Sequence, residues 1–331
     1  MERFKVGIIG AGHIARKMAH TLRDMEGVEP YAVASRNQEN AEGFASEWGF
    51  TRAYGSYEDL ADDPEVQLIY IATPHSHHFE QARMCLEKGK PVLCEKAFTA
   101  NAEQAETLIR LSKEKQVFLT EAIWTRYMPF SETLRELVDG GTIGRVMMLT
   151  ANIGYPIAEK EQRLHQDRFH KPELCGGALL DIGVYPINFA RMLFGSEITG
   201  ITSACVKGET GVDLQSSITF VYRNHRMAVL QMTAFCANDR QGVISGDKGY
   251  IIVDNINNPQ LAVVYSVNHE EVARYTCPPQ ITGFEYQVQA SIDAIREGKI
   301  ETPCMPHAET LHIMQMLDDL RSEWGVRYPM D

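Results

Sequence analysis

Asp181 and Tyr185 are the residues of this 331-residue sequence whose types and spacing first suggest chemistry. They lie in the run CGGALLDIGVYP, shortly after the pair Gly176-Gly177. Four residues make about one helical turn, so a helix here places the carboxyl group and the phenol on one face. Both groups can carry protons to and from a reacting molecule. The pair therefore raises the question of an acid–base function, which only the rest of the sequence can answer.

Lys96 is a second candidate for chemistry. It follows the apolar run PVLC and Glu95, at the end of a predicted strand. In α/β proteins, ligands bind outside the carboxyl ends of the parallel strands, which is where a residue in this position emerges. Most lysines are solvated surface residues, but this location favours a catalytic lysine.

Residues 1–122 alternate between strand-like and helix-like patterns. Regular alternation of this kind predicts an α/β fold, a doubly wound parallel Rossmann sheet with right-handed crossovers. The run Val66–Ala72 is nearly all apolar, as a strand buried on both faces should be. The predicted strands include Phe4–Gly10, Val28–Ser35, Val66–Ala72, Pro91–Cys94 and Val117–Ala122.

Residues 123–331 follow a different pattern. After a predicted helix, Phe130–Asp139, several β-rich runs follow one another without intervening helices. Consecutive strands of this kind predict an α+β domain with an open, mostly antiparallel sheet. Two helices, roughly 284–297 and 307–324, close the sequence. We therefore expect a nucleotide-binding domain, 1–122, followed by a substrate-binding and oligomerisation domain, 123–331.

The run Gly10-Ala11-Gly12-His13-Ile14-Ala15 matches the dinucleotide-binding pattern GxGxxA. The pattern alone is weak, but here it follows a predicted strand and opens a predicted helix, which is the context it requires. Glycines allow a tight turn and a close approach to a pyrophosphate, and the helix N-terminus supplies N–H donors. Four residues are predicted to contact the cofactor here: Gly10, Gly12, His13 and Ile14.

Ser35 and Arg36 end the second predicted strand, where NAD-binding proteins carry an acidic residue that bonds the ribose 2′-hydroxyl. A hydroxyl group and a guanidinium group can instead bind a 2′-phosphate. We therefore predict NADP as the cofactor, with NAD as the alternative.

The fourth predicted strand ends in Thr73-Pro74-His75-Ser76-His77-His78, which should line the cofactor. Three histidines within four residues raise the possibility of a metal site. However, adjacent side chains do not converge easily on one ion, and no carboxylate or cysteine joins them at a familiar spacing. We expect no metal, and we expect one histidine to be buried and the others to face solvent. The residues of this edge predicted to bind the cofactor are Thr73, Pro74, His75, His78, Glu95 and Lys96.

Four segments together, GIIGAGHIA, IATPHSHH, GKPVLCEKA and GGALLDIGVYP, resemble the Gfo/Idh/MocA oxidoreductases over essentially the whole chain. Glu95-Lys96 resembles the EKP signature of that family, with Ala97 in place of proline. GGALLDIGVY resembles its GGxxxDxGxH motif, with Tyr185 in place of histidine. The tyrosine and the run EAIWTRY are most similar to the dimeric dihydrodiol dehydrogenases, a branch that also oxidises D-xylose with NADP.

This resemblance implies a catalytic pair, Lys96 and Tyr185, that transfers a proton while a hydride moves to or from NADP. The chemistry agrees. A phenol has an ordinary pKa of about 10, and a nearby ammonium group favours the phenolate and lowers that pKa. Asp181 is expected to orient Lys96 or a substrate hydroxyl. The absence of proline at Ala97 leaves the placement of Lys96 as a question for the structure.

The predicted substrate is a cyclic diol or an aldose. Aromatic walls with one guanidinium group suit a ring that bears hydroxyls. Trp124 and Arg126, just past the sixth predicted strand, and Tyr155, at the end of a long strand, are the candidate pocket residues. Packing within the protein is the alternative role for these side chains. His170 is a weaker candidate.

The composition excludes several other classes of protein. The net charge is −12 and no basic run occurs, which argues against nucleic acid or an anionic membrane as a partner. No secretory signal or membrane-length apolar run is recognisable. Seven scattered cysteines without a CxxC motif are typical of reduced thiols, so we expect a cytoplasmic protein. An open sheet and the resemblance both favour a homodimer or higher homo-oligomer.

Three alternatives remain open at this stage. The same fold can act on another polyol, a keto-sugar or an imine. Some members of the family bind nucleotide without turning over a substrate, which would make this chain a regulator. A metal-dependent enzyme is the weakest alternative.

Overall fold

A computed structural model describes residues 3–157 and 168–331. The chain forms two compact units, Met1–Tyr127 with Gln280–Gln315, and Met128–Pro279 with Met316–Asp331. The division therefore differs from a simple split at residue 122, because residues 280–315 pack with the first unit. The hydroxyls of Thr282 and Thr21 are 2.6 Å apart there.

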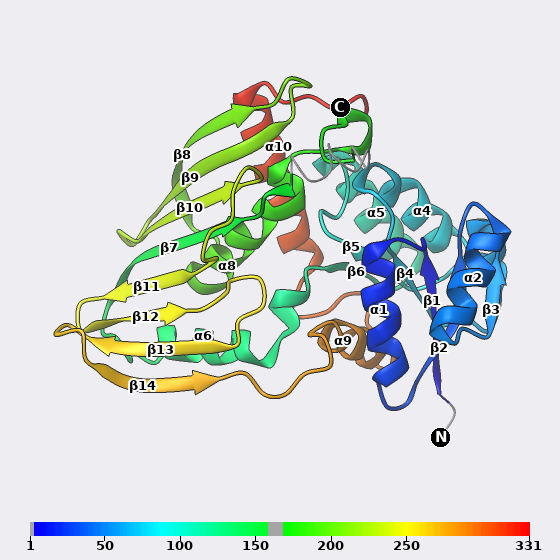
Figure 1. The fold of residues 1–331 in the computed structure, drawn as a ribbon, viewed down its shortest axis with the longest axis horizontal. Helices are drawn as coiled ribbons and strands as arrows, with labels where there is room; N and C mark the ends of the chain where they lie inside the picture. The colour runs from blue at the N-terminus through cyan, green and yellow to red at the C-terminus, as the bar shows by residue number, and fades with distance from the viewer. Residues whose placement is uncertain (1–2, 158–167) are drawn as a thin grey trace. The chain divides into compact units, whose positions relative to one another are not determined.

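The first unit contains a six-stranded parallel sheet with the order β3-β2-β1-β4-β5-β6 (Figure 1). This confirms the predicted doubly wound sheet. Helices connect successive strands; α1 packs on α2, and α4 packs on α3 and α5. The strands are β1 Phe4–Ile9, β2 Val28–Ala34, β3 Arg52–Tyr54, β4 Leu68–Ile71, β5 Val92–Glu95 and β6 Leu119–Ala122, and the helices are α1 His13–Asp24, α2 Gln38–Trp48, α3 Tyr57–Asp62, α4 His75–Glu87, α5 Ala102–Lys115 and α9 Glu285–Arg296.

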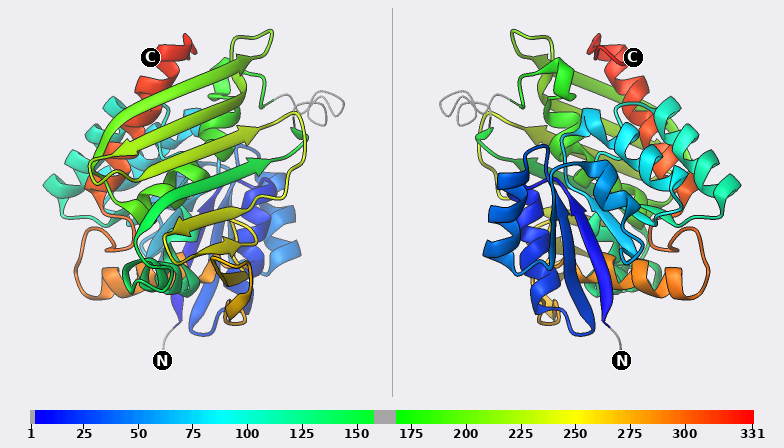
Figure 2. Two further views of the ribbon diagram at one scale, coloured as in Figure 1. Left: turned by 90° about the vertical axis from the view of Figure 1, so that its left-hand side faces the viewer. Right: turned by 90° about the vertical axis from the view of Figure 1, so that its right-hand side faces the viewer.

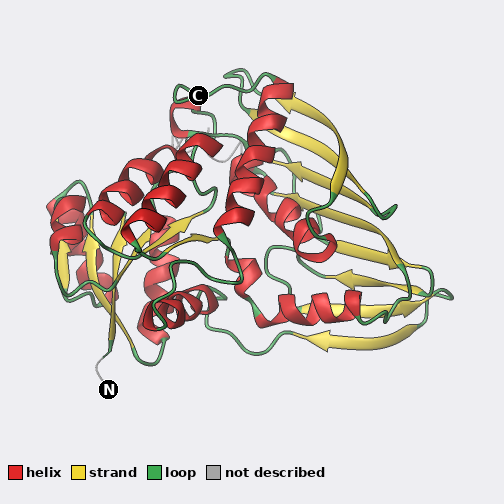
Figure 3. Ribbon diagram, turned by 180° about the vertical axis from the view of Figure 1, so that it is seen from behind, coloured by secondary structure: helices red, strands yellow, loops and turns green. Residues whose placement is uncertain are grey.

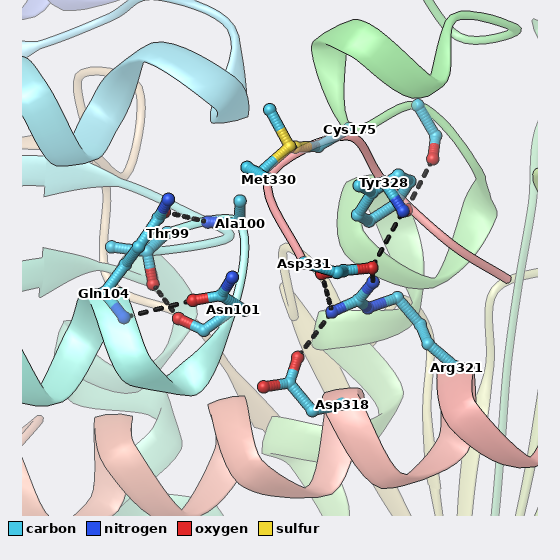
Figure 4. A network of polar contacts seen from close by, with 11 residues as sticks. Thr99, Ala100, Asn101, Gln104, Cys175, Asp318, Arg321, Tyr328, Met330 and Asp331 are labelled. Carbon is cyan, nitrogen blue, oxygen red and sulfur yellow. Dashed lines mark hydrogen bonds and ion pairs between the residues drawn. The ribbon is translucent and has the colours of Figure 1, made fainter.

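Short polar side chains begin three of these helices. Ser56 Oγ accepts a hydrogen bond from Asp59 N at 3.1 Å at the start of α3. Asn37 caps α2 in the same way. At α5, Asn101 Oδ1 accepts from Gln104 N while Gln104 Oε1 accepts from Ala100 N (Figure 4). These bonds satisfy amides that would otherwise lack partners at the helix ends.

The second unit is built on an eight-stranded sheet with the order β14-β13-β12-β11-β7-β10-β9-β8. Every neighbouring pair is antiparallel except β7 and β10, which confirms the predicted mostly antiparallel sheet. The strands are β7 Val146–Gly154, β8 Ile198–Lys207, β9 Asp213–Tyr222, β10 Met227–Thr233, β11 Gly242–Gly246, β12 Gly249–Val253, β13 Leu261–Ser266 and β14 Glu271–Thr276.

Helices cover one face of this sheet (Figures 2 and 3). Helix α8, Val184–Phe194, packs on β7 and β10, and α6, Pro129–Asp139, packs on α8. The long helix α10, His307–Trp324, bonds β8 through Trp324 Nε1 and Ser203 Oγ at 2.8 Å. The opposite face carries the alternate residues of each strand, among them Met148, Val221 and Met227.

The run CGGALLDIGVYP forms a helical stretch that begins irregularly. Leu179–Gly183 is a π-helical turn, in which Val184 N bonds Leu179 O, and α8 continues from Val184. Gly183 packs closely on the sheet, since a Cβ there would lie 2.6 Å from Met232 Sδ. Single π-turns within α-helices are rare and occur often at functional sites.

None of the helices among the described residues is both long and apolar enough to cross a membrane.

Candidate active site

The turn after β1 has the geometry that a bound pyrophosphate requires. Gly10 has a φ of +104°, and a Cβ there would lie 2.9 Å from Ala72 O, so no other residue fits without strain. Gly12 precedes α1, whose N-terminus has no side-chain cap and no acidic residue in its first turn. The backbone N–H groups of His13 and Ile14 therefore lie at a helix N-terminus that is suited to bind an anion. These residues fit a dinucleotide.

Arg36 lies at the end of β2 with an exposed side chain, next to half-buried Ser35. Its guanidinium acts on two neighbours. Burial, and then the charge of Arg36, lower the pKa of His77. Burial raises the pKa of Tyr57, and Arg36 opposes that shift. This end of the sheet therefore carries a hydroxyl group and a positive charge.

The histidine-rich loop differs from its sequence prediction. Helix α4 begins at His75, so His75 and His78 lie one turn apart on the inner face. Both are buried, at 4% and 0% exposure, where only one was expected to be, and His77 is the exposed one. Thr73 Oγ1 donates to Gln81 Oε1 at 2.6 Å. No group of three or more metal-ligating side chains occurs in residues 3–157 and 168–331.

His78 connects the two loops at the carboxyl edge of this sheet. Its Nε2 lies 2.8 Å from Thr73 O and its Nδ1 lies 2.9 Å from Ala97 O. Complete burial lowers the pKa of His78 to about 4, so the ring is neutral at physiological pH. A neutral ring has one N–H, so it donates to one of these two oxygens and lies against the other, between the turn that bears Lys96 and the turn that follows β4. The Lys96–Ala97 peptide bond is cis.

Glu95 anchors the same turn from the strand side. Its carboxylate accepts hydrogen bonds from the Tyr70 hydroxyl and, at 3.2 Å, from Lys96 N. Burial raises the pKa of Glu95, and the charge of Lys96 opposes that rise. Glu95 therefore holds the backbone of Lys96, in addition to lying where a cofactor contact was predicted.

Glu121, at the end of β6, is a buried acid that sequence reasoning did not single out. It is 1% exposed, and its Oε2 has no hydrogen-bond partner among the described residues. Burial raises the pKa of Glu121 to about 7; Thr310 and Arg126 oppose the rise. The sequence signal that could have identified Glu121 was a single acidic residue near the carboxyl end of the predicted strand Val117–Ala122.

Trp124 and Arg126 lie within the first unit. Trp124 is 4% exposed, with its ring 5.2 Å from that of Phe284 and 4.2 Å from the ammonium group of Lys17. Arg126 bonds Glu309 Oε1 at 3.0 Å and Cys304 O at 3.2 Å. Both side chains thus order the junction with residues 280–315, and a substrate contact for either stays a prediction.

Asp181 and Tyr185 lie in the second unit, on the helical stretch that begins with the π-turn. Asp181 Oδ1 is 3.3 Å from Arg168 Nη2, and Tyr185 is 8% exposed. Tyr155 follows β7, and its hydroxyl accepts from Arg240 Nη1 at 3.1 Å. Arg240 is a charged neighbour that the sequence did not suggest. His170 packs its ring against Phe169 at 6.0 Å.

Comparison with known proteins identifies the family. Residues 4–123 match the Gfo/Idh/MocA model described as an oxidoreductase family with an NAD-binding Rossmann fold, and residues 131–252 match the C-terminal domain of the same family. The trans-1,2-dihydrobenzene-1,2-diol dehydrogenase of Xenopus tropicalis is 34% identical over 333 residues, which cover 98% of this chain and 99% of that protein. The chain belongs to the Gfo/Idh/MocA oxidoreductase family.

Two further relatives of this Gfo/Idh/MocA protein are informative. The D-xylose 1-dehydrogenase (NADP(+)) of Hypocrea jecorina is 32% identical, covering 98% of this chain and 93% of that one. A 3-ketoreductase from Actinomadura kijaniata, solved with NADP and TDP-benzene, superposes with a TM-score of 0.87 at 23% identity over 97% of this chain and 98% of that one. At that identity the structural likeness establishes the fold.

The buried Glu121 predicts a pH-dependent stability. Its pKa rises from 4.5 to about 7 on folding, so it stabilises the fold below pH 4.5 and this contribution is lost as the pH rises through about 7. At about 1.4 kcal/mol per unit, the loss amounts to about 3 kcal/mol. Glu121→Gln removes the titrating group, so the free energy of unfolding of the wild type should fall relative to the variant between pH 5 and 8, measured by denaturant titration.

The matched control is Glu136→Gln, which changes an exposed carboxyl on α6. The difference in the free energy of unfolding between this variant and the wild type should not depend on pH. A constant difference for Glu121→Gln as well would show that this carboxyl does not titrate in that range.

Proposed function

We propose that this protein is an NADP-dependent dehydrogenase of a cyclic diol or an aldose, in which Tyr185 is the general acid–base and Lys96 lowers its pKa. The observation that carries the proposal is the full-length identity of 34% with a dihydrodiol dehydrogenase and 32% with an NADP-dependent xylose dehydrogenase. Lys96 lies in a turn and Tyr185 in helix α8, each within a run that resembles a motif of the family, and buried groups hold the backbone before or beside both.

The chemistry divides between the cofactor and the chain. A bound nicotinamide dinucleotide supplies the acceptor for the hydride. Tyr185, as the phenolate favoured by the ammonium group of Lys96, takes the proton from the substrate hydroxyl, and it returns that proton in the reverse direction. Asp181, paired with Arg168, orients a substrate hydroxyl or Lys96.

The dinucleotide is held by the turn after β1 and by the ends of β2, β4 and β5. Gly10 and Gly12 admit the pyrophosphate to the N-terminus of α1, where His13 and Ile14 lie. Ser35 and Arg36 bind the 2′-phosphate, which favours NADP over NAD. The remaining proposed contacts are Thr73, Pro74, His75, His78, Glu95 and Lys96, and the proposed substrate contacts are Trp124, Arg126 and Tyr155.

We also propose that the protein forms a homodimer through the uncovered face of the second sheet. Met148, Val221 and Met227 lie side by side in register on that face and are 40%, 36% and 39% exposed. Exposed apolar side chains that gather on one face mark interaction sites, and a twofold dimer is the commonest arrangement.

None of the seven cysteines forms a disulfide bond, which supports a cytoplasmic location.

A cofactor-binding regulator is the second candidate function, because Trp124 and Arg126, two of the proposed substrate contacts, have packing partners within the protein. A panel of trans-diols, aldoses, inositols and keto-sugars, with oxidised and reduced cofactor, separates the two. Tight cofactor binding without turnover of any compound would favour the regulator.

Tyr185→Phe tests the acid–base role. The variant keeps the ring, so its thermal stability should stay near that of the wild type, while kcat falls by about 10²- to 10⁴-fold because the proton acceptor is gone. Steady-state reduction of NADP measures this, and Lys96→Met should also be severely impaired. Tyr222→Phe, a change to another buried tyrosine of the same unit, is the control and should retain its activity. Turnover of Tyr185→Phe close to wild type would refute the role.

Arg36→Ala tests the choice of cofactor. A charge-assisted hydrogen bond to a phosphate contributes about 1.5–3 kcal/mol, so KM for NADP should rise by roughly 10- to 100-fold and KM for NAD should change little. The comparison of kcat/KM for the two cofactors decides it, with Arg110→Ala on α5 as the surface-charge control. A wild-type preference for NAD would contradict the assignment.

Met227→Lys tests the interface. A charge at the centre of an apolar contact is costly to bury, so light scattering should show a shift from dimer to monomer without loss of secondary structure. Ile281→Lys, which changes an exposed aliphatic side chain of the first unit, should leave the dimer intact. A variant at Met227 that remains dimeric would exclude this face as the interface.

A further inference from the structure

The turn Cys175–Gly177 immediately precedes the helical stretch that carries Asp181 and Tyr185. It is an unusual piece of backbone, with a φ of 54° at Cys175 and of +114° at Gly177. A Cβ at Gly176 would lie 2.3 Å from Phe169 O, so only glycine fits. This conformation must be held by its surroundings, because an isolated chain would not keep it.

Asp213 holds the turn from the side of the sheet. It is the first residue of β9 and is completely buried. Its Oδ2 accepts a hydrogen bond from Leu179 N at 2.6 Å, at the first residue of the π-turn. Its Oδ1 lies where a Cβ at Gly177 would be only 2.4 Å away. The carboxyl group therefore fills the space beside Gly177 and caps the helical stretch at once.

Tyr328 holds the same turn through a different bond. Its hydroxyl donates to Gly176 O at 2.7 Å. The segment Tyr328–Asp331 is itself anchored to α10, since Arg321 bonds Asp331 at 2.7 and 3.0 Å and Asp318 at 2.6 Å (Figure 4). The guanidinium of Arg321 also lies 4.5 Å from the centre of the Tyr328 ring.

The energetics distinguish Asp213 from a residue that merely fills space. Burial raises the pKa of Asp213 to about 6, and the amides of Leu179 and Ala178 and the charge of Arg321 oppose that rise. The group is therefore mostly ionised above neutral pH. A buried charge is costly, and a hydrogen-bond acceptor at a helix N-terminus is the role that offsets the cost.

We propose that Asp213 and Tyr328 are positioning residues for Tyr185, fixing the turn Cys175–Gly177 from two sides and thereby the start of the helical stretch that carries the phenol. Neither residue touches the reacting atoms. Leu179, whose amide Asp213 binds, is six residues before Tyr185, with a π-turn between them. A misplacement of about 1 Å at a reacting group can cost roughly 10²-fold in rate, so a loosened turn should appear in kcat.

The decisive comparison is between Asp213→Ala and Asp213→Asn. Asparagine keeps an oxygen acceptor and caps helices about as well as aspartate, whereas alanine leaves the amide of Leu179 without its partner. We expect kcat to fall by roughly 10- to 100-fold in the alanine variant and by less than about 3-fold in the asparagine variant. KM for NADP should change little in both, because the proposed cofactor residues lie in the other unit.

Asp254→Ala is the matched control. Asp254 Oδ1 accepts from Gln260 N at 3.0 Å and Leu261 N at 3.1 Å, in the connection between β12 and β13. Its loss removes bonds of the same kind from the same unit without touching the turn. It should lower the melting temperature and leave kcat unchanged. Hydrogen exchange of the peptide spanning residues 175–190 should accelerate in Asp213→Ala and not in Asp254→Ala.

Tyr328→Phe supplies a second test if Asp213→Ala fails to fold. The change removes one hydroxyl and keeps the ring on Arg321, so kcat should fall several-fold, with faster exchange in the same peptide. Three results would overturn the proposal. The first is a folded Asp213→Ala variant with wild-type kcat, and the second is an Asp213→Asn variant as impaired as the alanine variant. The third, if Asp213→Ala does not fold, is a Tyr328→Phe variant with wild-type kcat.

The inference rests on the proposed role of Tyr185, but the two can fail separately. In one outcome Tyr185→Phe has normal turnover, Asp213→Ala is slow and Asp213→Asn is not. The acid–base assignment of Tyr185 is then wrong, and the turn still positions the site through another group of the helix. If Tyr185→Phe is impaired and a folded Asp213→Ala is not, the positioning role falls and the acid–base assignment stands.

Discussion

Hydrogen bonds from buried polar side chains to the main chain hold the turn that carries Lys96 and the start of the helical stretch that carries Tyr185. In the first unit, His78 lies between Thr73 O and Ala97 O, next to Lys96. In the second, Asp213 accepts from Leu179 N at the start of the stretch that carries Tyr185. A reactive group keeps its position only when the backbone that carries it is held, and in both units buried side chains meet this requirement.

The charge state of His78 and that of Asp213 each suit the main-chain groups that the residue faces. His78 lies between two carbonyl oxygens, and its low pKa keeps the ring neutral, so its single N–H donates to one of them at a time and the ring carries no charge that would act on Lys96. Asp213 instead faces amides at a helix N-terminus, where a carboxylate is the favoured partner. A histidine or an uncharged side chain without an acceptor could not replace it there.

Much of this architecture could be predicted from the sequence, because it depends on local patterns. Alternating apolar strands and helices predicted the first sheet. The strand β14 was missed because it is an edge strand with charged residues on it, which obscure the alternation. The packing of residues 280–315 with the first unit was missed for another reason: contacts such as Thr282 to Thr21 join residues 261 positions apart.

The candidate site, too, could be predicted only in part from local sequence patterns. The motifs identified Gly10, Lys96 and Tyr185, whose residue types carry the chemistry, but not Asp213, which follows Gly211 and Val212 and reads as part of a polar connection. Nothing local distinguishes an acid that will be buried against a helix start from one that will be solvated. Its burial is decided by Gly177, which leaves room for its carboxyl group. Gly177 must therefore be glycine for a structural reason: the space that a Cβ would take is already filled by the carboxyl group that positions the helix.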